Sequence, residues 1–163
     1  LLPILTNRKL PLETRGRVYS SCVRSVMLYG SETWAASACT IRRLQRNDRA
    51  MIRWVSLVKP DDDVPFETLL SQLQLRDVAE ILQSGRLRWF GHIERSTSWI
   101  SQIRSMTIAS QQGQGRPKLA WTDLVMRDRT ALGMESTNPQ DRQKWRGRLR
   151  SSTGRQASPS SED

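Results

Sequence analysis

Five arginines recur within one stretch of the chain at a spacing that places them on one side of a helix. They are Arg42, Arg43, Arg46, Arg49 and Arg53. A helix over residues 40–55 turns its apolar side chains to the opposite side, because an α-helix rotates by about 100° per residue. Like charges four residues apart oppose helix formation, and a polyanion would relieve that repulsion. The pattern favours contact with phosphates, and a solvated charged face is the alternative.

Two carboxylates interrupt apolar stripes. Asp48 lies within the stripe of the predicted helix 40–55, and Asp128 lies within that of a predicted helix over residues 117–132. Asp48 could be a catalytic or metal-binding acid, or it could form a buried ion pair with an arginine of a neighbouring helix. We expect the ion pair, because lone buried carboxylates are rare. Three adjacent aspartates at 61–63 diverge from one another, so they predict a solvated, helix-capping loop instead of a metal site.

The chain has few other residues that could bind a metal ion or take part in catalysis. The chain has two cysteines and one histidine, too few for a structural zinc site or a Cys/His nucleophile. We expect His92 to be a hydrogen-bonded core or edge residue on the packed face of a helix over residues 77–95. No set of nucleophile, base and orienting group can be assembled. The sequence therefore predicts no catalytic residue, no metal site, no cofactor and no enzymatic activity of the chain on its own.

The charge balance points in the same direction as the arginine spacing. The 163 residues carry a formal net charge of +10, and only four of the 26 basic residues are lysines. The net charge is +8 over residues 1–60, −3 over 61–98 and +5 over 99–163. Arginine binds phosphate bidentately and stacks on bases, so this excess favours a nucleic-acid partner. The alternative is solubility, with arginine stems covering apolar surface.

Composition also limits the fold. Hydrophobic residues make up 37% of the chain, which predicts a thin core, while six Trp argue against a wholly disordered chain. No apolar run is long enough to cross a membrane, so we expect no membrane partner. The absence of an initial Met predicts a fragment. The predicted fold class is all-α: an irregular bundle of five or six helices with a disordered C-terminal tail.

The predicted helices cover residues 12–29, 40–55, 65–73, 77–95 and 117–132, with a last short helix after Asn138-Pro139. Thr40 and Asp77 are the expected N-caps of their helices. The predicted segments are a basic helical pair at 1–60, a central helical segment at 61–112, a loop with two helices at 113–150 and a disordered tail at 151–163.

Further basic residues join the predicted interface. In the helix over residues 12–29, the apolar face is predicted to include Tyr19, Val26 and Tyr29, which leaves Arg17 and Arg24 on the opposite side. Gly115-Arg116-Pro117 is similar to the core of an AT-hook, but a helix-entry loop is the favoured interpretation. Arg116 and Lys118 then form a second basic patch, where backbone N–H groups could also hold a phosphate.

Several short segments together resemble the C-terminal region of non-LTR (LINE-type) retrotransposon reverse transcriptases. The resemblance covers about residues 1–150. The segments are Val18-Tyr19-Ser20-Ser21-Cys22-Val23, Leu28-Tyr29-Gly30-Ser31-Glu32-Thr33-Trp34, Arg88-Trp89-Phe90-Gly91-His92-Ile93-Glu94-Arg95, Gly115-Arg116-Pro117 with Trp121, and Asp141-Arg142 with Trp145-Arg146. In that family this region follows the fingers and palm, and it looks like the thumb helices and the segment behind them.

The resemblance implies a function without catalysis. The thumb helps to grip the template–primer duplex, so the implied partner is an RNA–DNA hybrid or RNA, bound through backbone phosphates. The family's palm aspartates have no counterpart here, so the chain resembles part of an RNA-directed DNA polymerase that cannot polymerise alone. The missing palm and fingers are a second implied partner, and the implied localisation is nuclear or cytoplasmic.

One alternative function stays open. The chain could be a helical protein-interaction module from a degenerate or co-opted retroelement, with its arginines on an acidic protein surface. Leu87 and Phe90 would then belong to an interface. Apolar patches exposed in this way would produce self-association.

Overall fold

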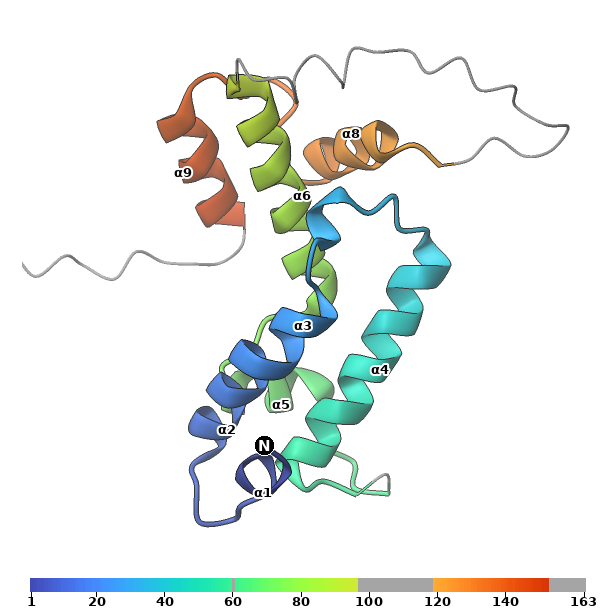
Figure 1. The fold of residues 1–163 in the computed structure, drawn as a ribbon, viewed down its shortest axis with the longest axis vertical. Coiled ribbons are helices and arrows are strands. Elements are labelled where there is room, and N and C mark those ends of the chain that lie inside the picture. The colour runs from blue at the N-terminus through green and yellow to red at the C-terminus, as the bar shows by residue number, and fades with distance from the viewer. Residues whose placement is uncertain (60, 97–118, 153–163) are drawn as a thin grey trace, which may run out of the picture. The chain divides into compact units, whose positions relative to one another are not determined.

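The computed structural model describes residues 1–59, 61–96 and 119–152, and every regular element in these ranges is helical (Figure 1). This confirms the predicted all-α class. No helix in the same ranges combines the length and the apolar character needed to cross a membrane. The elements are α1 (Leu2–Leu5), α2 (Leu12–Val18), the π-helical segment η1 (Tyr19–Arg24), α3 (Ser25–Met27), the 3-10 turn η2 (Ser31–Thr33), α4 (Ala38–Ser56), α5 (Phe66–Gln72), α6 (Val78–Arg95), α8 (Trp121–Ala131) and α9 (Arg142–Ser152).

The chain divides into two compact units. Unit 1 comprises Leu1–Ser31 and Ala36–Leu82, and unit 2 comprises Glu32–Ala35 and Gln83–Asp163. The division between the units therefore lies inside α6, between Leu82 and Gln83. The predicted segment bounds at 60/61 and 112/113 stay predictions, and the second of them lies outside the described residues. Helix α5 belongs to the predicted segment 61–112, but it packs against α4 in the core of unit 1.

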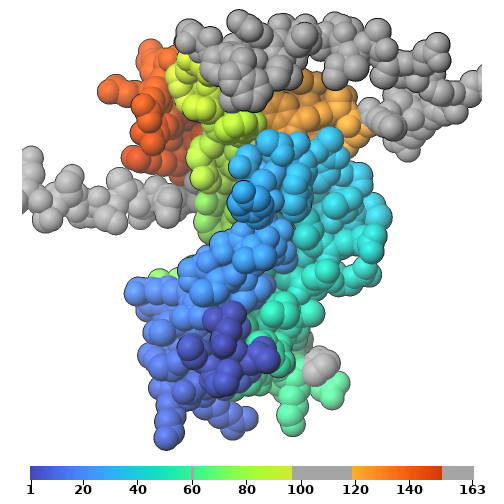
Figure 2. Space-filling view, viewed as in Figure 1, coloured from blue at the N-terminus to red at the C-terminus, as the bar shows by residue number. Residues whose placement is uncertain are grey.

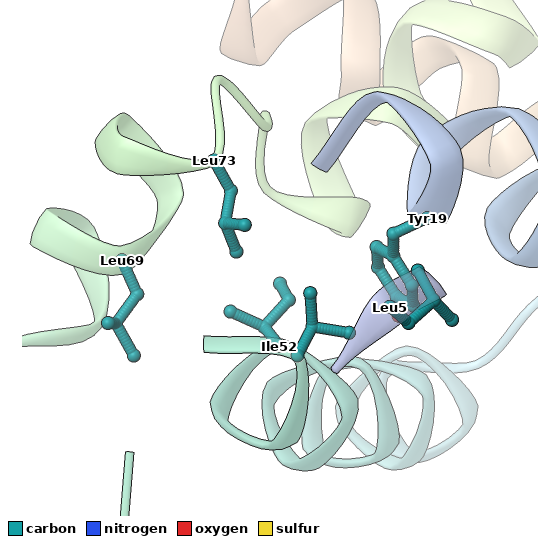
Figure 3. Close-up of a cluster of buried hydrophobic side chains, with 6 residues drawn as sticks. Leu5, Tyr19, Ile52, Leu69 and Leu73 are labelled. Atoms are coloured by element: carbon teal, nitrogen blue, oxygen red, sulfur yellow. The ribbon is translucent and has the colours of Figure 1, made fainter. Parts of the chain in front are cut away.

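The core of unit 1 brings together side chains from four stretches of the chain. Figure 3 shows Ile52 of α4 with Leu69 and Leu73 on one side and with Tyr19 and Leu5 on the other. All five are at most 1% exposed. Complete burial of a large apolar side chain contributes about 1.5–3 kcal/mol each, so these contacts hold α4 in place.

A π-helical segment alters the helix predicted over residues 12–29. The helical run of α2, η1 and α3 ends at Met27, and η1 lies in its middle. In a π-helix the hydrogen bonds run from residue i to i+5, so the side chains after it are rotated relative to an α-helix. Tyr19 and Arg24 are both buried as a result, while Val26 and Tyr29 are exposed. The predicted apolar face, which also includes Cys22, is therefore wrong at Cys22, Val26 and Tyr29, all of which are exposed.

Helix α4 begins and ends two residues or fewer from the predicted positions, but with a different cap. Its N-cap is Ser37, whose Oγ accepts a hydrogen bond from the backbone N–H of Thr40 at 3.2 Å. The predicted cap Thr40 is therefore wrong; it lies in the first turn. The helix closes at Leu57, which adopts a left-handed conformation with φ of 59°. The N–H of Val58 then bonds the carbonyl of Arg53, which satisfies a helix-end acceptor.

Unit 2 has a core of its own. Its buried side chains come from α6, α8, α9 and the α8–α9 connection: Leu87, Phe90, Val125, Met134, Trp145 and Leu149. The indole N–H of Trp145 donates to the carbonyl of Leu87 at 3.1 Å. Gly91 permits this approach, because a Cβ there would lie 2.5 Å from Trp145 Nε1. Leu87 and Phe90 are thus buried core residues of unit 2, whereas the alternative hypothesis placed them in an interface.

The remaining predicted boundaries are mostly confirmed. Asp77 caps α6 by accepting from the N–H of Ala79 at 2.7 Å, as predicted. Helix α8 starts at Trp121 instead of residue 117, and Gly133 follows it with φ of 60°. Helix α9 includes Ser152, so the predicted tail begins too early. Residues 153–163 of that tail and the predicted loop at 111–118 lie outside the described residues.

Candidate nucleic-acid interface

Helix α4 separates an apolar face from a basic one. Ile52 and Val55 are fully buried, and Ile41, Leu44 and Met51 are half-buried on the same side. The opposite side carries five arginines, which we call the arginine row. They are Arg42, Arg43, Arg46, Arg49 and Arg53. From the first to the last, the row extends roughly 16 Å at 1.5 Å per residue.

The N-terminal part of the arginine row is exposed and unopposed by acids. The side chains of Arg42, Arg43 and Arg46 are exposed, and no carboxylate of the described residues forms an ion pair with any of them. Figure 2 shows the teal surface of α4 at an outer edge of unit 1. These guanidinium groups are therefore accessible to an anion.

The C-terminal part of the row is partly engaged in unit 1. The Arg49 guanidinium lies over the ring of Phe66, 4.8 Å from its centroid, while the side chain stays exposed. Arg53 is half-buried, and its Nη2 donates to the carbonyl of Val64 at 3.4 Å. Arg49 can still present an edge to a phosphate, whereas Arg53 contributes mainly positive potential.

Asp48 is the only carboxylate of α4, and it does not offset the row. It is 1% exposed and accepts two hydrogen bonds from Arg24, at 2.9 Å from Nε and 2.6 Å from Nη2. The Tyr19 hydroxyl donates to the same carboxylate at 2.8 Å. Burial, reinforced by the Asp48 charge, raises the pKa of Tyr19 far above its usual value, so the phenol remains a donor. The predicted ion pair of Asp48 is confirmed.

Arg24 is therefore not an interface residue, and its inclusion in the predicted site is a correction. Its side chain is 3% exposed, and Nη1 also donates to the carbonyl of Arg76 at 2.6 Å. The π-helical segment causes the change: it aligns Tyr19 and Arg24, five residues apart, toward Asp48. In an α-helix the same two residues would point about 140° apart.

The remaining predicted site residues are Arg17, Arg116 and Lys118, and the structure describes only the first of them. Arg17 is exposed and forms an i,i+4 ion pair with Glu13, which weakens its positive field. Arg116 and Lys118 lie outside the described residues. The structure therefore brings together Arg42, Arg43, Arg46, Arg49 and, in part, Arg53.

Asp128, which interrupts the apolar stripe of α8, also forms an ion pair. Its Oδ2 accepts from Arg86 Nε at 2.8 Å, and both side chains are nearly buried. Each unit thus contains a buried Arg–Asp pair. Neither carboxylate is available for general acid–base chemistry.

Helix α9 presents basic residues that the predicted site omitted. Its exposed cations are Arg142, Lys144, Arg146, Arg148 and Arg150, and its sequence contains no acid. The pKa of the nearby Arg95 is lowered by burial and then by the charges of Arg142 and Arg146. The charge run was visible in the sequence, but nothing there showed that it would remain on the surface.

The described residues contain no group of three or more His, Cys, Asp or Glu that could hold a metal ion. Cys22 and Cys39 are both free and exposed. His92 is exposed, contrary to the predicted packed position, and stacks on Trp89 with 5.3 Å between ring centroids. The surface chemistry of the described residues is therefore dominated by guanidinium groups.

Comparison of the chain with protein-family models, with curated proteins and with solved structures finds no match. The interpretation of the arginine row accordingly depends on the exposure, spacing and pairing of its own side chains.

Proposed function

We propose that the chain is a non-catalytic nucleic-acid-binding part of a retroelement reverse transcriptase, which grips the backbone phosphates of a template–primer duplex. The observation that carries the proposal is the exposed N-terminal part of the arginine row, where Arg42, Arg43 and Arg46 have no acidic partner among the described residues. The segments that resemble thumb helices support the same assignment.

The physical basis is the repulsion within the row. Arg42 and Arg46 are one helical turn apart, and such like-charge pairs destabilise a helix by about 0.2–0.5 kcal/mol. A phosphate backbone carries closely spaced negative charges and releases counterions when arginines replace them. Because guanidinium groups contact phosphate oxygens, binding is expected to depend strongly on salt and weakly on sequence.

The test is a salt titration of binding to a labelled RNA–DNA hybrid, with duplex DNA and single-stranded RNA for comparison. The triple variant Arg42→Glu, Arg43→Glu, Arg46→Glu should lose hybrid binding. Any residual binding should have a slope of log K against log salt that is smaller by roughly three, about one unit per lost phosphate contact. Far-UV circular dichroism should be unchanged, because all three side chains are exposed.

A matched control separates the row from overall charge. The triple variant Arg8→Glu, Lys9→Glu, Lys59→Glu lowers the net charge by the same amount at exposed positions outside α4. This control variant should retain the wild-type slope of log K against log salt. Equal losses of hybrid affinity in the two variants would mean that overall charge, and not the arginine row, determines binding. Wild-type hybrid affinity in the Arg42, Arg43, Arg46 variant would remove the arginine row from the proposal.

A second candidate function is a protein-interaction module. It is favoured by apolar side chains on the surface of unit 1: Val26 is 77% exposed and Tyr29 is 85% exposed. Light scattering without nucleic acid distinguishes the two candidates. A mass well above 18.7 kDa that falls to this value in Val26→Ser, Tyr29→Ser would favour the interaction module.

A further inference from the structure

An open cavity on the surface of unit 2 combines aromatic and charged side chains. It measures about 290 Å³ and is lined by Glu32, Gly85, Arg88, Trp89 and His92. Four of these residues come from α6. The rings of Trp89 and His92 form its aromatic wall, stacked at an interplanar angle of 30°.

This aromatic pair is not needed for the core of unit 2. The buried cluster uses Leu87 and Phe90 of α6, together with Trp145 of α9. Trp89 is only half-buried and His92 is exposed, and both line the cavity, so the stacked pair is accessible to a ligand. A stack of two rings that ends at the surface of a cavity can be extended by a third flat ring.

Gly85 keeps the cavity open. A Cβ built on this residue would meet no atom within 4 Å, although the residue lies in the interior of an 18-residue helix. Glycine in such a position destabilises a helix by about 0.5–1 kcal/mol relative to alanine. Packing against a neighbouring element does not account for this glycine, whereas Gly91, six residues later, is required by Trp145.

We propose that this cavity binds an unpaired nucleobase of a single-stranded segment, stacked on the Trp89–His92 pair. The proposal rests on the nucleic-acid-binding function above and adds a recognition site to it. Aromatic side chains bind single strands in this way because every base has a π-face that can stack, whatever its sequence. In a duplex the same faces are covered by neighbouring base pairs.

The polar residues of the cavity fit the same ligand. Arg88 lines the cavity, and its guanidinium, which donates to Ser84 Oγ at 3.3 Å, carries a positive charge that attracts the phosphate of a stacked nucleotide. The Glu32 carboxylate is an acceptor for a ring N–H or an exocyclic amino group, a contact that bases supply at their edges. A purely aliphatic ligand would satisfy neither group.

The test fills the cavity without disturbing the fold. Gly85→Leu places a side chain in the open space and removes a glycine from α6, so the variant should be at least as stable as wild type. Gly147→Leu is the matched control, because a Cβ at Gly147 in α9 also meets no atom within 4 Å. Trp89→Leu removes the stacking wall as a second, independent variant.

The probes are a labelled eight-nucleotide single-stranded RNA, an abasic strand with the same phosphates, and a blunt RNA–DNA hybrid. Gly85→Leu and Trp89→Leu should bind the RNA strand at least about fivefold more weakly, the lower end of the loss of one stacked base. Affinity for the abasic strand and for the hybrid should stay at the wild-type value. Gly147→Leu should match wild type with all three probes.

The outcomes separate this site from the arginine row. If Gly85→Leu and Trp89→Leu bind the RNA strand as wild type does, or lose the abasic strand equally, the base site is overturned while the phosphate interface stands. If wild-type protein binds none of the three probes at low salt, the proposed function itself fails. Selective loss of the base-bearing strand supports the cavity.

Discussion

Asp48 lies on the apolar face of α4, where Arg24 and Tyr19 satisfy its carboxylate. An acid within an apolar stripe indicated a buried ion pair, and Asp48 forms one. A regular α-helical period places its partner Arg24 on the surface. One π-helical segment changes that period, and nothing in the local residue types marks where such a segment starts. The sequence therefore predicts that Asp48 forms a buried ion pair, but it does not predict that Arg24 is the partner.

The buried pair makes a prediction for stability. Arg24→Met should lower the free energy of unfolding by about 3–5 kcal/mol, because Asp48 would remain buried without its cationic partner. Tyr19 would still donate one hydrogen bond to it. Urea denaturation followed by circular dichroism measures the change. The double variant Arg24→Met, Asp48→Leu should be less destabilised than the single variant, since it leaves no unpaired charge. A double variant with a larger loss than the single one would contradict this account.

At the scale of the elements, helix positions were more predictable than their contacts. Apolar periodicity located α4, α5, α6 and α9 within a few residues, and the capping residue Asp77 located the start of α6, because these signals act within one or two turns. The role of a glycine in the interior of a helix was not predictable, because it depends on what another element places nearby. Gly16 of α2 shows this: a Cβ there would lie 2.0 Å from the carbonyl oxygen of Leu73.

Substitution by alanine should destabilise the protein at Gly16 and stabilise it at Gly85. Gly16→Ala should destabilise the protein by about 1–3 kcal/mol or more, because backbone atoms of Leu73 would have to move. Gly85→Ala should stabilise it by roughly 0.5–1 kcal/mol, since the added Cβ meets open space within a helix. Thermal denaturation of the two variants beside wild type measures both. Stabilisation of both variants would show that helix propensity, and not the contact with Leu73, determines the response at Gly16.

At the scale of the whole molecule, the chain contains two separate cores. The core of unit 1 draws on residues from Leu5 to Leu73, and the core of unit 2 draws on residues from Leu87 to Leu149. Helix α6 begins in one unit and ends in the other. The segments predicted from charge and loop composition did not reveal this division, because composition does not report which distant helices pack together.

The two cores predict that damage to one unit stays within it. Asp128→Ala leaves Arg86 buried in unit 2 without its carboxylate, which should cost about 3 kcal/mol of local stability. Native-state hydrogen exchange of the full chain should then show faster exchange in α8, in α9 and in the part of α6 after Leu82.

The amides of α4 should keep their wild-type protection in this variant, and the salt-dependent binding of the arginine row should persist. Arg24→Met is the reciprocal test: its loss of protection should centre on α4 and α2 and leave Trp145 and its neighbours unaffected. Uniform acceleration across both units in either variant would mean that α6 couples the two cores into one cooperative unit. In that case the phosphate interface would depend on the integrity of the whole chain, and a lost activity in any core variant would say nothing about where the nucleic acid binds.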